Sequence, residues 1–281
     1  MPRARVGTYV APAHRRKRGA AMATGSRTVR PRSSVWLSER KTPKRKGDQQ
    51  PVGLDHLKIV AATMRLLDAE GLSGFSMRRL AAELGVTAMS VYWYVETKDH
   101  LLELALDAAM GEIALPIEAV GPVEGLEHAP AEPRDWREQL RQVASEYRRV
   151  LVRHPWLSAL LGEYLNIGPN AVVFQHAALA VMRNSGLPDD RITSALALVY
   201  EFVYGFGTIE GRFAARCRAA GVTQEELFHE MMGTVEDRME FDEARKIMEA
   251  RGGGTVQEMQ DRDFAFALDL AIAGIEALRE R

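Results

Sequence analysis

Several features are scarce in this sequence of 281 residues, and each absence narrows what the protein can be. The single cysteine, Cys217, cannot form a disulfide within the chain, as is typical of proteins in a reducing compartment. Alternating apolar and polar residues are nearly absent, so strands are not expected. No uninterrupted apolar stretch looks long enough to cross a bilayer, and the basic N-terminal segment lacks the apolar core of a signal peptide. These absences predict an all-α cytoplasmic protein with no membrane partner.

Patterns that indicate catalysis or metal binding are also scarce. His154, His176 and His229 are scattered and lack the spacing of metal ligands. The glycines of residues 205–211 have the wrong spacing for a phosphate-binding loop and follow no strand, so they favour the close approach of two helices. Cys217 has no evident partner base, which suits a half-buried structural thiol. We therefore expect no enzyme, no cofactor and no metal site.

Charge is distributed unevenly along the chain. Residues 1–47 hold fourteen of the 37 Lys and Arg residues and one acidic residue, Glu39, which gives this segment a net charge of +13 in a chain of net charge −1. With the linker that follows, residues 1–53 are predicted to be a disordered basic arm. The arm can track DNA phosphates or enter the minor groove. Alternatively, the arm is a solvated tail. A third interpretation is that the start codon was assigned too far upstream and translation begins at Met22. Residues 35–37 form an apolar cluster in it that can dock on the folded body.

Residues 74–104 carry the pattern of a helix-turn-helix unit. Ser76 can cap a helix whose apolar face recurs at intervals of three and four residues, and Gly85 can end that helix in the left-handed conformation. A second short helix over residues 88–94 would bury Val91 and Val95. Two helices joined by a tight turn place the second in the DNA major groove. The alternative is a small three-helix core without a DNA role, but packing alone does not require outward aromatic residues on so short a helix.

This stretch also resembles the signature of the TetR family of repressors. The positions that match are Arg78, Leu80, Ala81, Gly85, Val86, Val91, Tyr92, Val95, Lys98 and Leu101. The preceding helix, residues 54–70 with Gly71 at its end, fits the same family. The resemblance implies a DNA-binding domain at residues 54–104 and a helical regulatory and dimerisation domain at residues 105–281.

Within the DNA-binding unit, the residue types suggest which side chains contact DNA. Arg78 is the candidate for a base edge, because arginine can donate twice to guanine, and the matching arginine of tetracycline-type members does so. Lys98 begins the next helix, where a phosphate suits the helix N-terminus. Tyr92 can equally be a core aromatic residue with its hydroxyl outside. The full candidate set is Ser76, Arg78, Arg79, Ala88, Met89, Ser90, Tyr92, Trp93, Tyr94 and Lys98.

The remaining chain is predicted to be a series of helices. Asp135 and Thr223 can cap helix N-termini, and the three glycines of residues 252–254 predict a break between helices. The last helix, residues 255–278, resembles the terminal helix of the tetracycline-repressor subgroup. The resemblance implies that this helix and the longest one, residues 187–218, pair with their copies in a four-helix dimer interface. The candidate interface residues are Leu196, Val199, Phe202, Val203, Phe264, Phe266, Leu268, Leu270 and Ile272. Alternatively, both apolar stripes are ordinary core of one protomer.

Tetracycline-type members hold a magnesium–drug complex through two histidines, and the resemblance places Ala114 and Leu160 or Leu161 at those positions. Neither residue type can bind a hard cation, and Glu210 alone makes a poor site. We therefore expect a largely apolar organic effector bound without metal. The candidate pocket residues are Trp156, Leu160, Tyr164, Phe174, Tyr200, Tyr204 and Phe206, although any one of them can simply fill the core.

Together these features predict a ligand-responsive transcriptional repressor. It would bind a palindromic operator in double-stranded DNA as a homodimer, and the small apolar effector would release it. The alternative is a constitutive DNA-compacting protein in which the basic arm supplies most of the nonspecific binding.

Overall fold

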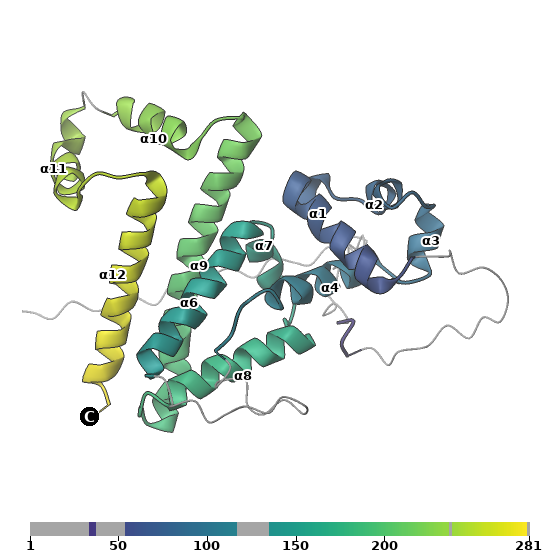
Figure 1. Cartoon of the computed structure of the whole chain (residues 1–281), viewed down its shortest axis with the longest axis horizontal. Helices are drawn as coiled ribbons and strands as arrows, with labels where there is room; N and C mark the ends of the chain where they lie inside the picture. Colours follow the sequence, from purple (N-terminus) through teal and green to yellow (C-terminus); the bar gives the residue numbers. More distant parts are fainter. Residues whose placement is uncertain (1–33, 38–53, 117–134, 236–237, 280–281) are drawn as a thin grey trace, which may run out of the picture. The chain divides into compact units, whose positions relative to one another are not determined.

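The computed structural model describes residues 34–37, 54–116, 135–235 and 238–279. In these ranges the chain is helical and contains no strand, which confirms the all-α prediction (Figure 1). The expectations for the basic arm fall on residues 1–33 and 38–53, outside the described residues. The helices are α1 (His56–Gly74), α2 (Met77–Glu83), α3 (Ala88–Tyr92), α4 (Lys98–Met110), α6 (Trp136–Arg153), α7 (Leu157–Leu161), α8 (Pro169–Arg183), α9 (Asp189–Ala220), α10 (Gln224–Gly233), η1 (Met239–Phe241), α11 (Asp242–Arg251) and α12 (Val256–Ala277).

Local signals define the first three helices. The Ser76 hydroxyl accepts a hydrogen bond from the backbone of Arg79 at the start of α2, and Gly85, with φ +66°, turns the chain into α3. Gly71, with φ +68°, interrupts the regular helix of α1, and one further turn continues to Gly74. The sequence predicted that the second helix of the motif would continue to residue 94, but α3 ends at Tyr92. It is short because the chain must turn so that Val95 enters the core, where it is 4% exposed.

Helix α4 leads from the first three helices into the rest of the molecule. It packs against α1, α7 and α8, and its apolar face is buried along most of its length. Asp107, near its C-terminal end, accepts hydrogen bonds from the backbone of Ala171 (3.0 Å) and of Asn170 (3.4 Å), the first turn of α8. A carboxylate at this place satisfies free N–H groups and complements the helix dipole. Burial nevertheless raises the pKa of Asp107, against the lowering effect of those hydrogen bonds.

Helix α9 lies along α6, and α12 runs beside α9 (Figure 1). Two glycines on α9 allow the close approach that the sequence predicted: a Cβ at Gly211 would lie 2.9 Å from the Leu151 carbonyl oxygen, and one at Gly207 would lie 3.0 Å from the Leu151 Cβ. By length and composition α9 could cross a membrane, with a mean hydropathy of 1.4 in its most apolar window. The prediction concerned uninterrupted apolar stretches, and α9 is not one, because Glu201 and Glu210 interrupt its apolar part.

The C-terminal part contains elements that the sequence only partly predicted. Capping boxes at Thr223–Glu226 and Thr255–Glu258 begin α10 and α12, and the former box was predicted. Gly252 has φ +84° and ends α11, which confirms the predicted break. Helix α11 itself was not predicted, because it is polar and buries none of its residues.

Candidate DNA-binding and effector sites

Helix α3 presents an exposed surface of one methionine and two aromatic residues. Met89 is 70% exposed, Tyr92 43% and Trp93 48%, whereas Val91 is completely buried beneath them. Two of these side chains lie on a helix of five residues and the third, Trp93, directly follows it, and so large an exposed apolar area indicates a surface that binds a partner. The outward aromatic residues predicted from the sequence are therefore present.

The cationic candidates differ in whether another group of the protein already binds them. Arg78 is exposed and, among the described residues, has no hydrogen-bond or ion-pair partner. The guanidinium of Arg79, by contrast, is paired with Glu70 of α1. The Lys98 ammonium donates to the Phe75 carbonyl oxygen at 3.0 Å and lies 5.2 Å from the centre of the Phe75 ring. Of these three cations, Arg78 alone can address a base without breaking a contact within the described part of the chain.

Other candidates have structural partners within the unit. The Tyr94 hydroxyl donates to the Leu54 carbonyl oxygen at 2.8 Å, and its ring lies edge-on to His56, so this side chain fixes the start of α1. Ser90 lies 2.9 Å from the hydroxyl of Thr87, and Ser76 accepts from its own helix. Ala88 is half-buried at the start of α3.

Thr87 and Thr97 were missed by the sequence reasoning. Thr87 caps α3 and Thr97 caps α4, each through its hydroxyl oxygen, and both are exposed. A threonine directly before an apolar helical run is a recognised signal for a helix N-terminus, so the capping pattern could have identified them. Exposed hydroxyls at two helix N-termini add to the groups that can meet phosphates.

An aromatic cluster lies between α6, α8 and α9. Tyr147 of α6 stacks on Tyr200 with ring centres 5.2 Å apart and meets Phe174 at 5.3 Å, while Tyr200 stacks on Tyr204 at 6.2 Å. The Tyr204 hydroxyl donates to the Ser158 carbonyl oxygen at 2.8 Å. Burial raises the pKa of Tyr147 and of Tyr200, so both hydroxyls stay protonated at any physiological pH. Phe174, Tyr200 and Tyr204 were predicted; Tyr147 was not.

The other predicted pocket residues are distributed around this cluster. Leu160 is fully buried on α7, and the Tyr164 hydroxyl donates to Asp99 of α4 at 3.3 Å. Trp156 is buried as well, but its indole N–H donates to Asp68 of α1 at 2.7 Å. Trp156 therefore joins the regulatory part to the DNA-binding helices.

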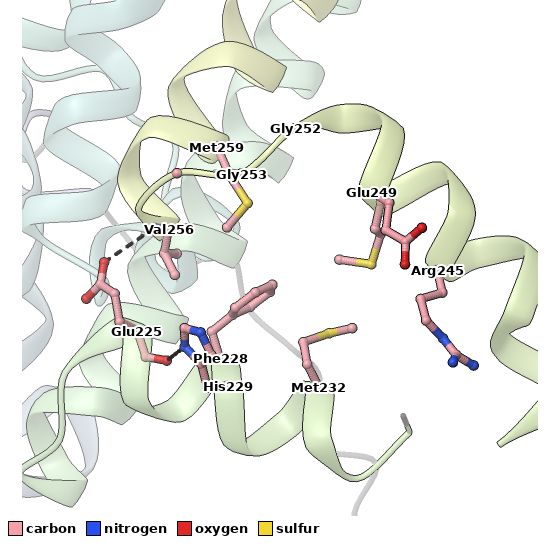
Figure 2. Close-up of a pocket in the computed structure, with 12 residues that line it drawn as sticks. Glu225, Phe228, His229, Met232, Arg245, Glu249, Gly252, Gly253, Val256 and Met259 are labelled. Atoms are coloured by element: carbon pink, nitrogen blue, oxygen red, sulfur yellow. Dashed lines mark hydrogen bonds between the residues drawn. The ribbon is translucent and has the colours of Figure 1, made fainter. Parts of the chain in front are cut away.

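Two cavities lie near the C-terminal helices. The first, of about 340 Å³, is bounded by α10, α11 and α12, and Figure 2 shows Phe228, Met232 and Met259 lining it. The second, of about 320 Å³, lies between α9, α10 and α12 and includes Phe206, one of the predicted pocket residues, together with Ile209 and Phe213. The sequence reasoning did not select the methionines of α10 and α12.

The predicted dimer residues separate into two groups. Val199, Val203, Phe264, Leu268 and Ile272 are each at most 6% exposed inside a single protomer. Phe202 is half-buried and stacks on Phe264 with ring centres 5.3 Å apart, and Leu196 is also half-buried. Phe266 and Leu270 are 67% and 59% exposed. The buried five pack in the core of a single protomer, which favours the alternative interpretation for these positions, and their place in a dimer interface stays a prediction.

Comparison with known proteins identifies the family. Residues 59–105 match the family model described as bacterial regulatory proteins, tetR family, and residues 129–279, more than half of the chain, match the tetracyclin repressor-like C-terminal domain. The chain belongs to the TetR family. Members of this family are transcriptional regulators and not enzymes.

Two relatives of this TetR-family protein are named as transcriptional regulators. It is 37% identical over 172 residues to an HTH-type transcriptional regulator of Saccharopolyspora erythraea, covering 61% of this chain and 65% of that one. It is 32% identical over 204 residues to the HTH-type transcriptional repressor DrrR1 of Streptomyces coeruleorubidus, covering 72% and 69%. The chain thus spans slightly less than two thirds of the first relative.

Solved structures show the same fold. ActR of Streptomyces coelicolor without ligand is 25% identical, with a TM-score of 0.58 over 81% of this chain and 99% of ActR. ActR in complex with actinorhodin is 26% identical, with a TM-score of 0.60 over 81% and 97%. The resemblance therefore includes both the DNA-binding helices and the regulatory helices.

Proposed function

We propose that this TetR-family regulator is a repressor released from DNA by a small organic effector. The observation that carries the proposal is the course of α4, which starts at the exposed helix-turn-helix surface and packs against α7 and against α8, the helix that carries Phe174 of the aromatic cluster. A ligand that displaces α7 or α8 therefore acts directly on the helix that carries the DNA-binding unit. Two relatives support this: DrrR1 is named a repressor, and ActR is solved with actinorhodin.

The proposed DNA-binding form is a homodimer on a palindromic operator. Phe266 and Leu270 of α12 and Leu198 and Ile209 of α9 are exposed apolar side chains, each 55–73% exposed, on two helices that pack against each other. Such side chains on two neighbouring helices suit pairing with their own copies. A two-fold dimer presents two α3 helices to two half-sites about one helical turn apart, roughly 34–36 Å, or a multiple of that.

The proposed effector is largely apolar and binds without a metal ion. The positions that hold magnesium–drug complexes in tetracycline-type members carry Ala114 and Leu160 or Leu161 here. Glu210, the remaining acidic candidate, is paired with Arg148, so its charge is already neutralised. The rings of Tyr147, Phe174 and Tyr200 pack against one another in the regulatory body, and such aromatic surroundings suit a flat molecule oriented by a few hydroxyls.

Footprinting on the DNA flanking this protein's own gene tests the repressor. The expected result is one protected palindrome, bound at concentrations at which scrambled DNA of the same length stays free. Uniform, salt-sensitive coverage without a preferred site would instead support the DNA-compacting alternative, driven by the +13 charge of residues 1–47.

Thermal-shift screening of planar aromatic metabolites and antibiotics, with and without magnesium, tests the effector. A hit is expected to raise the melting temperature equally in both buffers and to release the protected DNA. Stabilisation that requires magnesium would contradict the metal-free site.

A further inference from the structure

A buried histidine joins the DNA-binding helices to the regulatory helices. His154, which follows α6, is 1% exposed. Its Nδ1 lies 2.6 Å from Oδ1 of Asp68 on α1, and its Nε2 lies 3.1 Å from Oε2 of Glu112, which follows α4. Asp68 is 86 positions away from the histidine and Glu112 is 42 positions away, so one imidazole ring connects three separate parts of the chain.

This geometry determines the protonation state of the ring. Each ring nitrogen faces a carboxylate oxygen, and an ionised carboxylate only accepts hydrogen bonds. A neutral imidazole has one N–H and would place the lone pair of its other nitrogen against a negative oxygen. The imidazolium ion donates from both nitrogens and balances part of the charge of Asp68 and Glu112. The arrangement is therefore satisfied only when His154 is protonated.

We propose that protonated His154 is a charged joint that holds the DNA-binding helices on the regulatory body, and that loss of its proton loosens this joint. Release by an effector does not require this histidine. The proposal therefore adds pH as a second signal, and it stands whether or not the proposed function is correct. The pKa direction agrees: burial lowers the pKa of His154, but the hydrogen bonds and charges of Asp68 and Glu112 outweigh burial and raise it.

The neighbouring groups indicate which half of the joint would open. Glu112 has two other cationic partners. The Arg153 guanidinium lies 3.3 Å from the Glu112 carboxylate, and the Arg149 guanidinium donates to the backbone carbonyl oxygen of Glu112. Within the described part of the chain, the other partner of the Asp68 carboxylate is a neutral donor, the indole N–H of Trp156 at 2.7 Å. Deprotonation therefore removes the only positive charge that these contacts supply to Asp68, and the attachment of α1 weakens first.

Hydrogen–deuterium exchange of the full-length protein tests the joint. His154→Gln keeps a polar side chain of similar size without the charge, and His176→Gln, at an exposed histidine of α8, is the matched control. At pH 6.0, peptides from α1 are expected to exchange faster in His154→Gln than in wild type, and at pH 8.5 the difference should shrink. His176→Gln should match wild type at both values. An equal difference at both pH values would show a packing role alone and overturn the proposal.

A second measurement does not require the His154→Gln variant to fold. In protein labelled with carbon-13 at the histidine Cε1, the His154 resonance should titrate above its ordinary pKa of 6.5. In Asp68→Asn, which removes one of the two carboxylates, the midpoint should move down. A wild-type midpoint at or below 6.5, or a midpoint that Asp68→Asn leaves in place, would refute the charged joint.

Discussion

Arg148 of α6 makes a bidentate ion pair with Glu210 of α9, with Nε 2.7 Å from Oε2 and Nη2 2.9 Å from Oε1. The third nitrogen, Nη1, lies 2.7 Å from Oδ1 of Asp261 on α12. The guanidinium also lies 4.7 Å from the centre of the Phe264 ring. One side chain thus fixes the relative position of α6, α9 and α12, and the fork geometry of arginine makes this possible.

Replacing Arg148 by methionine should strongly destabilise the protein. Glu210 is 3% exposed, and removing its partner would leave a buried carboxylate unpaired, at a cost of about 3–5 kcal/mol in the free energy of unfolding. Arg141→Met is the control, because its partner Asp269 is exposed and such surface pairs contribute about 0–1 kcal/mol. Urea denaturation measures both. Equal losses of unfolding free energy in the two variants would show that the buried pair stabilises the protein no more than the exposed pair does.

Arg78→Ala should weaken operator binding by about 1–3 kcal/mol while binding to scrambled DNA changes little. The reason is that Arg78, which has no partner among the described residues, can address a base edge, whereas a phosphate contact contributes equally on every DNA sequence. Arg79→Ala is the matched control, since Arg79 is the next residue and is paired with Glu70. Both variants are titrated on both DNAs. If Arg78→Ala weakens binding equally on the two, the side chain contacts only the DNA backbone.

Deleting residues 1–47 should flatten the dependence of DNA affinity on salt and leave the choice of operator intact. Removing one interaction with a DNA phosphate reduces the log–log slope by about 0.9. The described piece of this arm, residues 34–37, is held by α4: the Val35 N–H donates to Oε2 of Glu103 at 2.6 Å. Deleting residues 1–33 alone retains that anchor and removes nine of the fourteen basic residues, so it tests the charge of the outer part of the arm with the anchor in place. If neither deletion changes the log–log slope of DNA affinity against salt, the arm does not contact DNA.

Phe266→Asp combined with Leu270→Asp should convert the dimer to monomers without unfolding it. Both side chains are exposed in a single protomer, so the aspartates meet water there, but in a dimer interface their charges would be buried. Phe202 is a poorer target, because it stacks on Phe264 inside the protomer. Ile247→Asp on α11, also at an exposed position, is the control. Sedimentation velocity measures the mass, and a wild-type monomer would end the homodimer proposal.

The stability of the protein should fall as the pH rises above about 6.5. The folded-state pKa of His154 is raised above its ordinary 6.5, so its contribution is complete below 6.5 and is lost as the pH rises through the folded value. His154→Gln should remove that decline between pH 6.0 and 8.5, and His176→Gln should keep it. Urea midpoints at several pH values show this directly. A decline that persists in His154→Gln must come from other groups.

The DNA-binding unit shows how much local sequence can define. Ser76 as a cap, Gly85 as a stop and the buried positions Val91 and Val95 were all predicted correctly. Caps, turns and helical periodicity depend on residues within a few positions of one another, so they can be read without knowing the fold. The residues that contact DNA remain predictions, although Tyr94 and Lys98 now have intramolecular partners that the sequence did not reveal.

By itself the sequence determined that the chain is helical, where most helices begin and end, and that a helix-turn-helix unit precedes a larger helical body. Only the tertiary structure decided which apolar face of α12 is core: Phe264 and Leu268 turn inward, whereas Phe266 and Leu270 face outward. It also decided that His154 meets Asp68 and Glu112. Both depend on how distant helices pack, and periodicity along one helix gives its apolar faces without saying which of them another helix will cover.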